Sequence, residues 1–214
     1  MNAHRTCILI IGIVSLAGCA VTREPRNLSE AKQQVSEYAN GRYEADLKAV
    51  SKEADAWIAK RSARGGKLAV VFDIDETTLS NLEIMRESDW GYDEARWHEW
   101  MDSAKAPAIP QLREVYQNTR SRGVAVFFIT GRKERLRAAT TRNLTRQGMG
   151  GFTGLICRPN ENTEPAAVYK AHRRREISRQ GYTIIANIGD QPSDLAGGFA
   201  ERTFKLPNPF YRIP

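Results

Sequence analysis

Apolar and polar residues divide the chain into two parts with different periodicities. From Leu28 to about Ser62 the sequence is rich in Ala, Glu, Lys and Gln, and its apolar residues recur at helical spacing. Beyond residue 64, short apolar runs without polar alternation are separated by longer helical patterns. Such runs are typical of strands that are covered on both faces. The pattern therefore predicts an N-terminal helical segment followed by an α/β domain.

The N-terminal helical segment is expected to form two helices. Gly41 interrupts the pattern, and glycine is among the poorest helix formers. Asn27, with Glu30 three residues later, resembles an N-terminal capping pair. The second helix would present one apolar face to the main domain. Its members are Tyr43, Leu47, Val50, Ala54 and Trp57.

Four apolar runs in the second part are predicted to be β-strands. They are Leu68–Ile74, Val124–Ile129, Gly154–Cys157 and Thr183–Ile188. The helical patterns Lys133–Gln147 and Pro165–Gln180 lie between strands and are followed by Gly148 and Gly181, which suit the left-handed end of a helix. The alternation of strand and helix predicts a parallel sheet with helices on both faces.

The first residues resemble an export signal. The apolar run Cys7–Gly18 is too short to span a bilayer, which takes ~20 residues. It ends at Leu16-Ala17-Gly18-Cys19, which resembles a bacterial lipobox. We expect cleavage before Cys19 and a lipid on its thiol, the alternative being a signal peptide that is cut elsewhere. Cys157 would then have no partner, so an internal disulfide is not expected.

The chain carries a formal net charge of +7, which favours anionic partners such as phosphate esters or anionic lipid. The densest basic run is Arg173-Arg174-Arg175, which follows Lys170 in a helical pattern. A solvated helix face is the favoured interpretation of this run, ahead of a nucleic-acid patch. No nucleic-acid partner is therefore expected.

Polar residues follow the ends of several predicted strands. Asp73 and Asp75 end the first run, Thr130 follows the second, and Asp190 and Asp194 follow the last. Ligands of parallel sheets bind outside the carboxyl ends of the strands, and residues i and i+2 of a strand face the same side. Carboxylate oxygens are ligands for a hard cation such as Mg²⁺. The sequence thus predicts a site at this edge with a metal and two closely spaced acids.

These strand ends resemble four motifs of one enzyme family. Residues 71–77 (Val-Phe-Asp-Ile-Asp-Glu-Thr) resemble the first motif, and 129–132 (Ile-Thr-Gly-Arg) the second. Residues 169–170 (Tyr-Lys) are similar to the third motif, and 189–194 (Gly-Asp-Gln-Pro-Ser-Asp) to the fourth. The family is the haloacid dehalogenase (HAD) superfamily, subfamily IIIB, with plant acid phosphatases, vegetative storage proteins and bacterial class C lipoprotein acid phosphatases. The resemblance spans about 67–212 and implies a Rossmann-like parallel sheet.

The resemblance also implies a chemistry for each motif. Asp73 would attack phosphorus to form an aspartyl-phosphate, and Asp75 would act as general acid and then as general base. Thr130 and Lys170 would bind the phosphoryl group, although Lys170 could also be an ordinary surface lysine. Mg²⁺ is the implied cofactor. Its implied ligands are Asp73, Asp75, Asp190 and, often through water, Asp194.

About fifty residues separate the first and second motifs, more than a crossover helix needs. The excess predicts a small helical cap at about 80–112, in which Trp90 and Tyr92 could stack on a nucleobase or an aryl leaving group. The alternative is that the aromatic residues only pack the cap on the core, and Trp97 and Trp100, three residues apart, favour it most. The predicted units are a signal peptide at 1–18, a tether and helical segment at 19–64, and the phosphatase domain at 65–214.

The sequence therefore predicts an exported enzyme that is lipid-anchored, facing the periplasm from the outer membrane, and that hydrolyses small phosphomonoesters such as nucleoside monophosphates. One alternative is a phosphotransferase that uses the same intermediate. Another is a non-catalytic storage or binding protein, which the presence of Asp73 argues against. The sparse His and Cys residues suit neither a zinc site nor a phosphohistidine mechanism.

Overall fold

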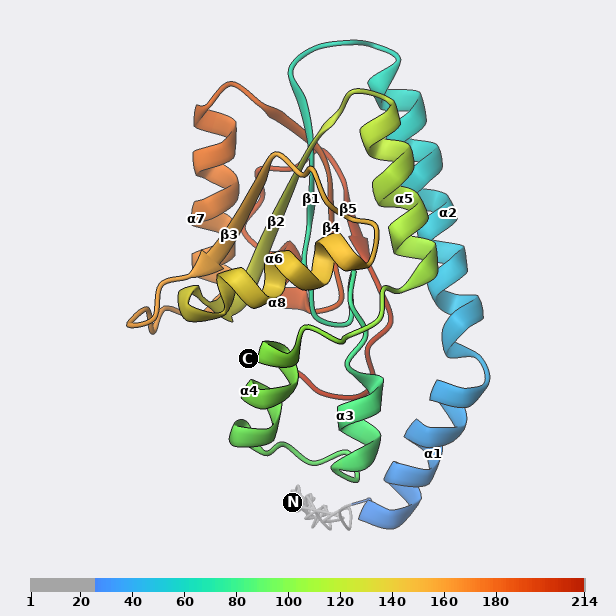
Figure 1. Cartoon of the computed structure of the whole chain (residues 1–214). Helices are drawn as coiled ribbons and strands as arrows, with labels where there is room; N and C mark the ends of the chain where they lie inside the picture. The colour runs from blue at the N-terminus through green and yellow to red at the C-terminus, as the bar shows by residue number, and fades with distance from the viewer. Residues whose placement is uncertain (1–25, 214) are drawn as a thin grey trace, which may run out of the picture.

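The computed structural model describes residues 26–213, and these form the predicted α/β fold around one parallel sheet (Figure 1). The strand order is β3-β2-β1-β4-β5, so β1 is central. The strands are β1 (Leu68–Phe72), β2 (Ala125–Lys133), β3 (Gly154–Arg158), β4 (Thr183–Gly189) and β5 (Thr203–Lys205). The first four correspond to the predicted apolar runs. The edge strand β5 was not predicted, because its three residues include only one apolar side chain.

The helices follow the predicted pattern in the N-terminal segment and between the strands. They are α1 (Leu28–Asn40), α2 (Tyr43–Ser62), α3 (Leu82–Glu87), α4 (Glu94–Ser103), α5 (Pro110–Ser121), the 3₁₀ turn η1 (Glu134–Leu136), α6 (Arg137–Arg146), α7 (Ala166–Arg179) and α8 (Pro192–Leu195). Gly41 separates α1 from α2, as predicted. The Asn27 side chain accepts hydrogen bonds from two backbone N–H groups in the first turn of α1, which confirms the predicted cap.

Helices cover both faces of the sheet, which explains why the strand sequences do not alternate. Val70 and Phe72 of β1 belong to the core beneath α2 and α5, whereas Ala69 and Val71 pack against α7 on the other face. Figure 1 shows α2 and α5 side by side on one side of the sheet and α7 on the opposite side. The sheet is therefore buried on both faces, and its accessible chemistry is confined to the strand ends.

Two short helices stand outside the main domain at the carboxyl end of the sheet. They are α3 and α4, which lie in the segment for which a cap is predicted (Figure 1). They share a small apolar cluster built around Ile84, Met85 and Trp97. Helix α1 also contacts this segment, because the Trp90 indole donates a hydrogen bond of 3.0 Å to Ser36 Oγ. Helix α1 thus contacts the outer side of the segment that contains α3 and α4, which we call the cap.

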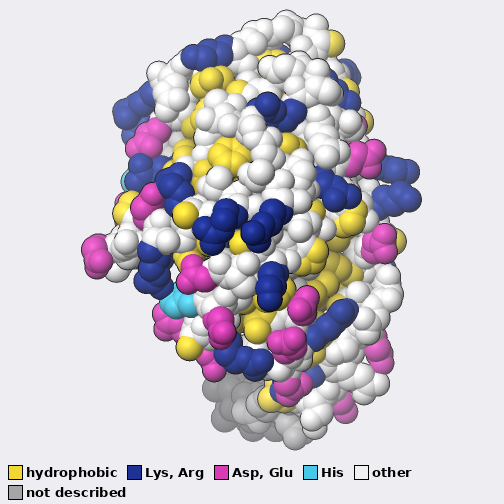
Figure 2. All heavy atoms as spheres, viewed as in Figure 1, with side chains coloured by type: hydrophobic (Ala, Val, Ile, Leu, Met, Phe, Trp, Pro, Cys, Tyr) yellow, Lys and Arg dark blue, Asp and Glu magenta, His cyan; other side chains and the backbone are white. Residues whose placement is uncertain are grey.

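The Arg173-Arg174-Arg175 run does not form a uniformly solvated face. Arg175 is exposed, but Arg174 is 0% exposed, so the prediction is wrong for this residue. Its guanidinium donates to the backbone carbonyls of Asp194, Ala196 and Gly198. Burying a cation is tolerated here because its N–H groups meet carbonyl oxygens. Figure 2 shows Lys and Arg side chains interspersed with acidic and apolar ones on the face it presents.

Nothing in the described part of the chain bears on the predicted lipid anchor. Cys19 and the predicted signal peptide lie outside residues 26–213. Within those residues, none of the helices is both long enough and apolar enough to cross a membrane.

Candidate active site

The chain turns sharply where β1 ends, and this turn presents both predicted catalytic aspartates. The Ile74 carbonyl accepts hydrogen bonds of 2.9–3.2 Å from the backbone N–H groups of residues 77–79. Glu76 has a φ of 55°, a left-handed conformation that non-glycine residues seldom adopt. Asp73 and Asp75 therefore project from a loop whose backbone is fixed by its own hydrogen bonds.

Asp73 is buried beside a lysine from helix α7, which covers the same face of the sheet. Lys170, in the first turns of α7, donates hydrogen bonds of 2.5 Å to Asp73 Oδ1 and 2.6 Å to Asp194 Oδ1. Burial raises the pKa of Asp73 well above its usual range; Lys170 opposes this, and Asp194 and Asp190 add to it. Burial also disfavours the charged form of Lys170, but the two aspartates outweigh this effect and raise its pKa.

Asp190 follows β4 and is held by three side-chain donors. Thr77 Oγ1 donates to Asp190 Oδ1 at 3.0 Å, while Gln191 Nε2 and Asn208 Nδ2 donate to Oδ2 at 2.7 and 2.6 Å. Burial raises the pKa of Asp190, and the nearby Asp194 carboxylate raises it further. The three donors fix the position of the carboxylate without neutralising its charge.

Asp194 lies in α8, where it is locked by a reciprocal cap. Its Oδ2 accepts a hydrogen bond of 2.8 Å from the Gln191 backbone N–H. A Cβ atom on Gly189 would come within 2.5 Å of Asp194 Cβ, so this close approach requires glycine. Asp194 thereby orients the Lys170 ammonium toward Asp73.

Asp75 has different neighbours, although it lies only two residues from Asp73. Arg132 donates from Nη2 to Asp75 Oδ1 at 2.7 Å and from Nε to Oδ2 at 3.1 Å, and Asn81 Nδ2 donates to Oδ1 at 2.9 Å. Burial acts to raise the pKa of Asp75, but Arg132 and Asn81 together lower it below its ordinary value. Thr130, the predicted phosphate ligand, is also buried and accepts from the Arg132 backbone N–H at 3.1 Å.

A further carboxyl group, Glu76, is buried behind Asp75. It accepts hydrogen bonds from the Asn81 backbone N–H at 2.5 Å and from the Tyr211 hydroxyl at 2.7 Å. Burial raises the pKa of Glu76 to about 8, and the charge of Asp75 contributes. The site is thus backed by a network that connects the first loop to the C-terminal tail.

Several of these residues were missed by the sequence predictions. Arg132 belongs to the Thr-Gly-Arg motif, but no role was assigned to it. Glu76 lies within the first motif, again without an assigned role, whereas Asn81 and Tyr211 carry no local pattern of their own. Asn208 lies within the span of the family resemblance, about 67–212, but outside its four motifs.

The donor set fits a divalent metal. Oxygen atoms of Asp73, Asp190 and Asp194 lie within 4.8 Å of one another, and all three side chains are buried. With Asp75, four carboxylates meet only two cationic side chains, Lys170 and Arg132. A divalent cation would balance the remaining two negative charges with the hard oxygen ligands that such ions prefer.

The two aromatic residues predicted to face a substrate differ in their surroundings. The Trp90 ring stacks on Phe210 with the centroids 5.4 Å apart, and its indole N–H is used by Ser36. Tyr92 is 73% exposed and contacts Trp97 at a centroid distance of 5.9 Å. Of the pair, Tyr92 has the ring surface available to a ligand.

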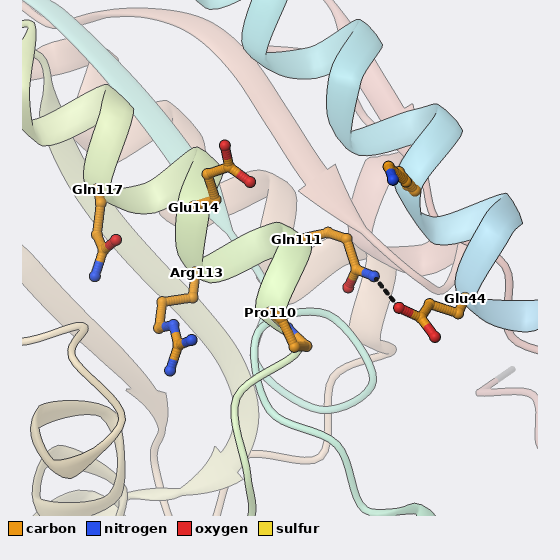
Figure 3. A pocket seen from close by; sticks show the side chains of 7 residues that line it. Glu44, Pro110, Gln111, Arg113, Glu114 and Gln117 are labelled. Carbon is orange, nitrogen blue, oxygen red and sulfur yellow. Dashed lines mark hydrogen bonds between the residues drawn. The ribbon is translucent and has the colours of Figure 1, made fainter.

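A surface groove between α2 and α5 is separate from these residues (Figure 3). Across it, Gln111 donates a hydrogen bond of 3.3 Å to Glu44. Its lining residues are Glu44, Lys48, Pro110, Gln111, Arg113, Glu114 and Gln117. None of them is a predicted site residue, so the chemistry of the chain is not located in this groove.

Comparison with known proteins agrees with the geometry. The chain is 37% identical to acid phosphatase 1 of Solanum lycopersicum over 192 residues, which cover 86% of this chain and 75% of that protein. It is 31% identical to vegetative storage protein 1 of Arabidopsis thaliana, covering 87% and 72% of the two chains. The class C acid phosphatase of Bacillus anthracis superposes with a TM-score of 0.70 at 25% identity, covering 85% of this chain and 86% of that one.

The profile described as HAD superfamily, subfamily IIIB (Acid phosphatase) matches residues 14–214. This match includes every strand of the sheet and every carboxylate described above. The chain therefore belongs to the acid phosphatases of HAD subfamily IIIB.

Proposed function

We propose that this acid phosphatase is Mg²⁺-dependent and hydrolyses small phosphomonoesters through an aspartyl-phosphate on Asp73. The observation that carries the proposal is the buried contact of Asp73 with Lys170, beside Asp190 and Asp194. A carboxylate so placed is oriented by an ammonium group that can also meet the charge of a phosphoryl group. The family membership makes phosphate esters the class of substrate.

The proposed reaction has two steps. A carboxylate oxygen of Asp73 bonds to phosphorus while the ester P–O bond breaks. Asp75, which its low pKa leaves ionised in the free site, takes the proton that the phosphomonoester monoanion brings and gives it to the departing alkoxide. Water then attacks phosphorus, its proton passes to Asp75, and the bond to Asp73 breaks to release phosphate. Thr130 and Lys170 stabilise the charge on the phosphoryl oxygens in both steps.

Mg²⁺ would be held by the Asp73 carboxylate, the Asp75 carbonyl and Asp190, with Asp194 reaching it through water. When bound, it would withdraw charge from the phosphoryl oxygens and keep Asp73 ionised. Lys170 and the buried acids would set the direction from which Asp73 attacks phosphorus. We therefore expect removal of the metal to change the charge balance of the site and to leave the arrangement of its residues unchanged.

The test is phosphate release from the chain in Mg²⁺, in EDTA and after Asp73→Asn. We expect EDTA to abolish activity reversibly and Asp73→Asn to lower it by at least ~10³-fold, because amide oxygen is a poor nucleophile. Asp102→Asn makes the same chemical change at an exposed position on α4 and should leave activity unchanged. Activity that survives Asp73→Asn would refute the mechanism.

Substrate choice is proposed to depend on Tyr92 more than on Trp90, since Tyr92 is 73% exposed whereas the half-buried Trp90 ring stacks on Phe210. A panel of nucleoside monophosphates, sugar phosphates and aryl phosphates would rank the classes. For Tyr92→Ala, we expect KM to rise for the nucleoside and aryl esters and to stay unchanged for sugar phosphates. An equal change for all three classes would exclude stacking.

We further propose that the protein is an exported lipoprotein anchored at Cys19 and facing the periplasm. The support is the lipobox-like Leu16-Ala17-Gly18-Cys19 sequence after a short apolar run. Metabolic labelling with palmitate should mark the wild type and not Cys19→Ser. Equal labelling of the two would contradict the anchor.

A further inference from the structure

The amide of Asn81 lies between the cap and the proposed acid/base. Asn81 is fully buried, and its Nδ2 donates to Asp75 Oδ1 at 2.9 Å and to Glu76 Oε2 at 3.0 Å. Its Oδ1 accepts a hydrogen bond of 2.8 Å from the indole of Trp100 on α4. One side chain therefore connects a cap helix to Asp75.

The orientation of this amide is fixed by what surrounds it. An indole N–H can only donate, so it must face the amide oxygen. The ionised Asp75 carboxylate can only accept, so it must face the amide nitrogen. A flipped amide would set Asn81 Oδ1 against Asp75 and Glu76 and its NH₂ group against Trp100. The Trp100 hydrogen bond thus selects the orientation that serves Asp75.

The consequence for Asp75 is an asymmetric carboxyl group. Asn81 and Arg132 both donate to Oδ1, whereas Oδ2 receives only Arg132 Nε at 3.1 Å. The side chain remains 23% exposed. Oδ1 is committed to the protein, so Oδ2 is the oxygen left to exchange a proton with the leaving group.

We propose that Asn81, whose amide is oriented by Trp100, is a positioning residue for Asp75. Proton delivery by Asp75 then depends on how α4 packs against the loop that follows β1. This inference rests on the proposed role of Asp75 as general acid. It assigns the cap a function in catalysis that is independent of substrate contact. A misplaced cap would weaken proton delivery before it weakened phosphate binding.

Helix α4 supplies a matched control for this idea. Trp97 lies one turn before Trp100, is 8% exposed, and its indole N–H has no hydrogen-bond partner within residues 26–213. Trp97→Phe and Trp100→Phe make the same change of ring on the same helix. Only the second removes a hydrogen bond, so packing losses are common to both.

The experiment measures kcat/KM for 4-nitrophenyl, phenyl and 4-methoxyphenyl phosphate, whose shapes are similar and whose leaving groups become progressively more basic. Trp100→Phe should lower kcat/KM for the most basic leaving group about 3- to 10-fold more than for 4-nitrophenolate, the loss expected for one hydrogen bond. Trp97→Phe should affect all three equally. Asn81→Ala removes the donor itself and should repeat the pattern of Trp100→Phe.

Equal losses across the three esters in both Trp100→Phe and Asn81→Ala would overturn the proposal and leave Trp100 a packing residue. Asp75→Asn separates this outcome from a failure of the mechanism. If Asp75→Asn shows strong dependence on the leaving group and the other variants do not, only the positioning role is wrong. If Asp75→Asn shows none, Asp75 is not the acid, and the positioning role fails together with the acid/base step of the proposed mechanism.

Discussion

Asp73 and Asp75 are two residues apart, yet they lie in opposite surroundings. Asp73 faces the α7 side, which we define as Lys170, Arg174 and Asp194, and burial among further acids raises its pKa. Asp75 faces the cap side, defined as Asn81, Trp100 and Arg132, and its pKa is lowered. One strand end thus holds two carboxyl groups that are made different by the elements beyond it.

The comparison teaches how the roles are divided. The α7 side comes from the segments that follow β3 and β4, and together with Asp73 and Asp190 it forms the buried cluster of acids that fits a metal. The cap side combines Asn81 and Trp100, from the segment between β1 and α5, with Arg132 of β2, and it supplies directional donors to a single carboxyl group. The first side determines whether the reaction can occur, and the second adjusts proton transfer.

The largest difference in kcat/KM is expected between substitutions of the two cationic side chains, Lys170 beside Asp73 and Arg132 beside Asp75. Lys170→Met should lower kcat/KM by ~10³-fold, because it removes charge stabilisation at the phosphoryl group. Arg132→Lys keeps a charge beside Asp75 but loses the forked donor geometry, and should cost ~10-fold. Steady-state kinetics with 4-nitrophenyl phosphate in Mg²⁺ measures both. Losses of equal size would remove the distinction between the two sides.

Glu76, which accepts hydrogen bonds from Asn81 of the cap side, should contribute to how stability depends on pH. The pKa of Glu76 is about 8 in the folded state and near 4.5 in the unfolded chain, so the folded state binds the proton more tightly. Its contribution to the free energy of unfolding is complete below about pH 4.5 and is lost as pH rises toward 8. The loss is about 1.4 kcal/mol per pH unit and on the order of 5 kcal/mol in all.

Urea unfolding in EDTA at a series of pH values checks this dependence. Glu76→Gln should flatten part of the wild-type decline, and the difference between the two curves isolates Glu76 from the other acids. Curves that run parallel from pH 5 to 8 would show that Glu76 keeps an ordinary pKa.

On the α7 side, the buried guanidinium should be a major source of stability. Arg174→Met leaves the carbonyls of Asp194, Ala196 and Gly198 without their donor, and should lower the free energy of unfolding by about 3 kcal/mol. Arg175→Met is the control at the exposed neighbouring position and should stay within ~0.5 kcal/mol. Denaturant titration compares them, and equal small effects would disprove the role of Arg174.

Metal binding should stabilise the fold through Asp190 and not through the carboxylate of Asp75. Mg²⁺ at 100 times its Kd should raise the free energy of unfolding by about 2.7 kcal/mol. Asp190→Asn should abolish this gain, whereas Asp75→Asn should retain it, because only the backbone carbonyl of Asp75 is proposed as a ligand. Thermal unfolding with and without Mg²⁺ gives the answer. A gain lost equally in both variants would place the Asp75 carboxylate on the metal.

The sequence was sufficient for strands β1 to β4 because apolar runs and glycine stops are local signals, but not for the short edge strand β5. It was insufficient for Arg174, because whether a cation is buried depends on carbonyl groups some twenty residues away. It also did not predict the hydrogen bond between Asn81 and Trp100, which forms only when the cap has folded against the loop that follows β1. Local patterns thus predict which elements form, and pairs that are distant in sequence decide which side chains meet.

The central position of β1 has a consequence for folding. Val71 pairs with Phe127 on one side and Asn187 on the other, so both neighbours of β1 come from far along the chain. Contacts of such separation require costly loop closure and are typical of slow folders. No fragment that lacks either neighbour can bring Asp73 to Lys170 and Asp190. Recovery of activity after dilution from denaturant should therefore follow the slowest phase of sheet assembly, with no partly active intermediate before it.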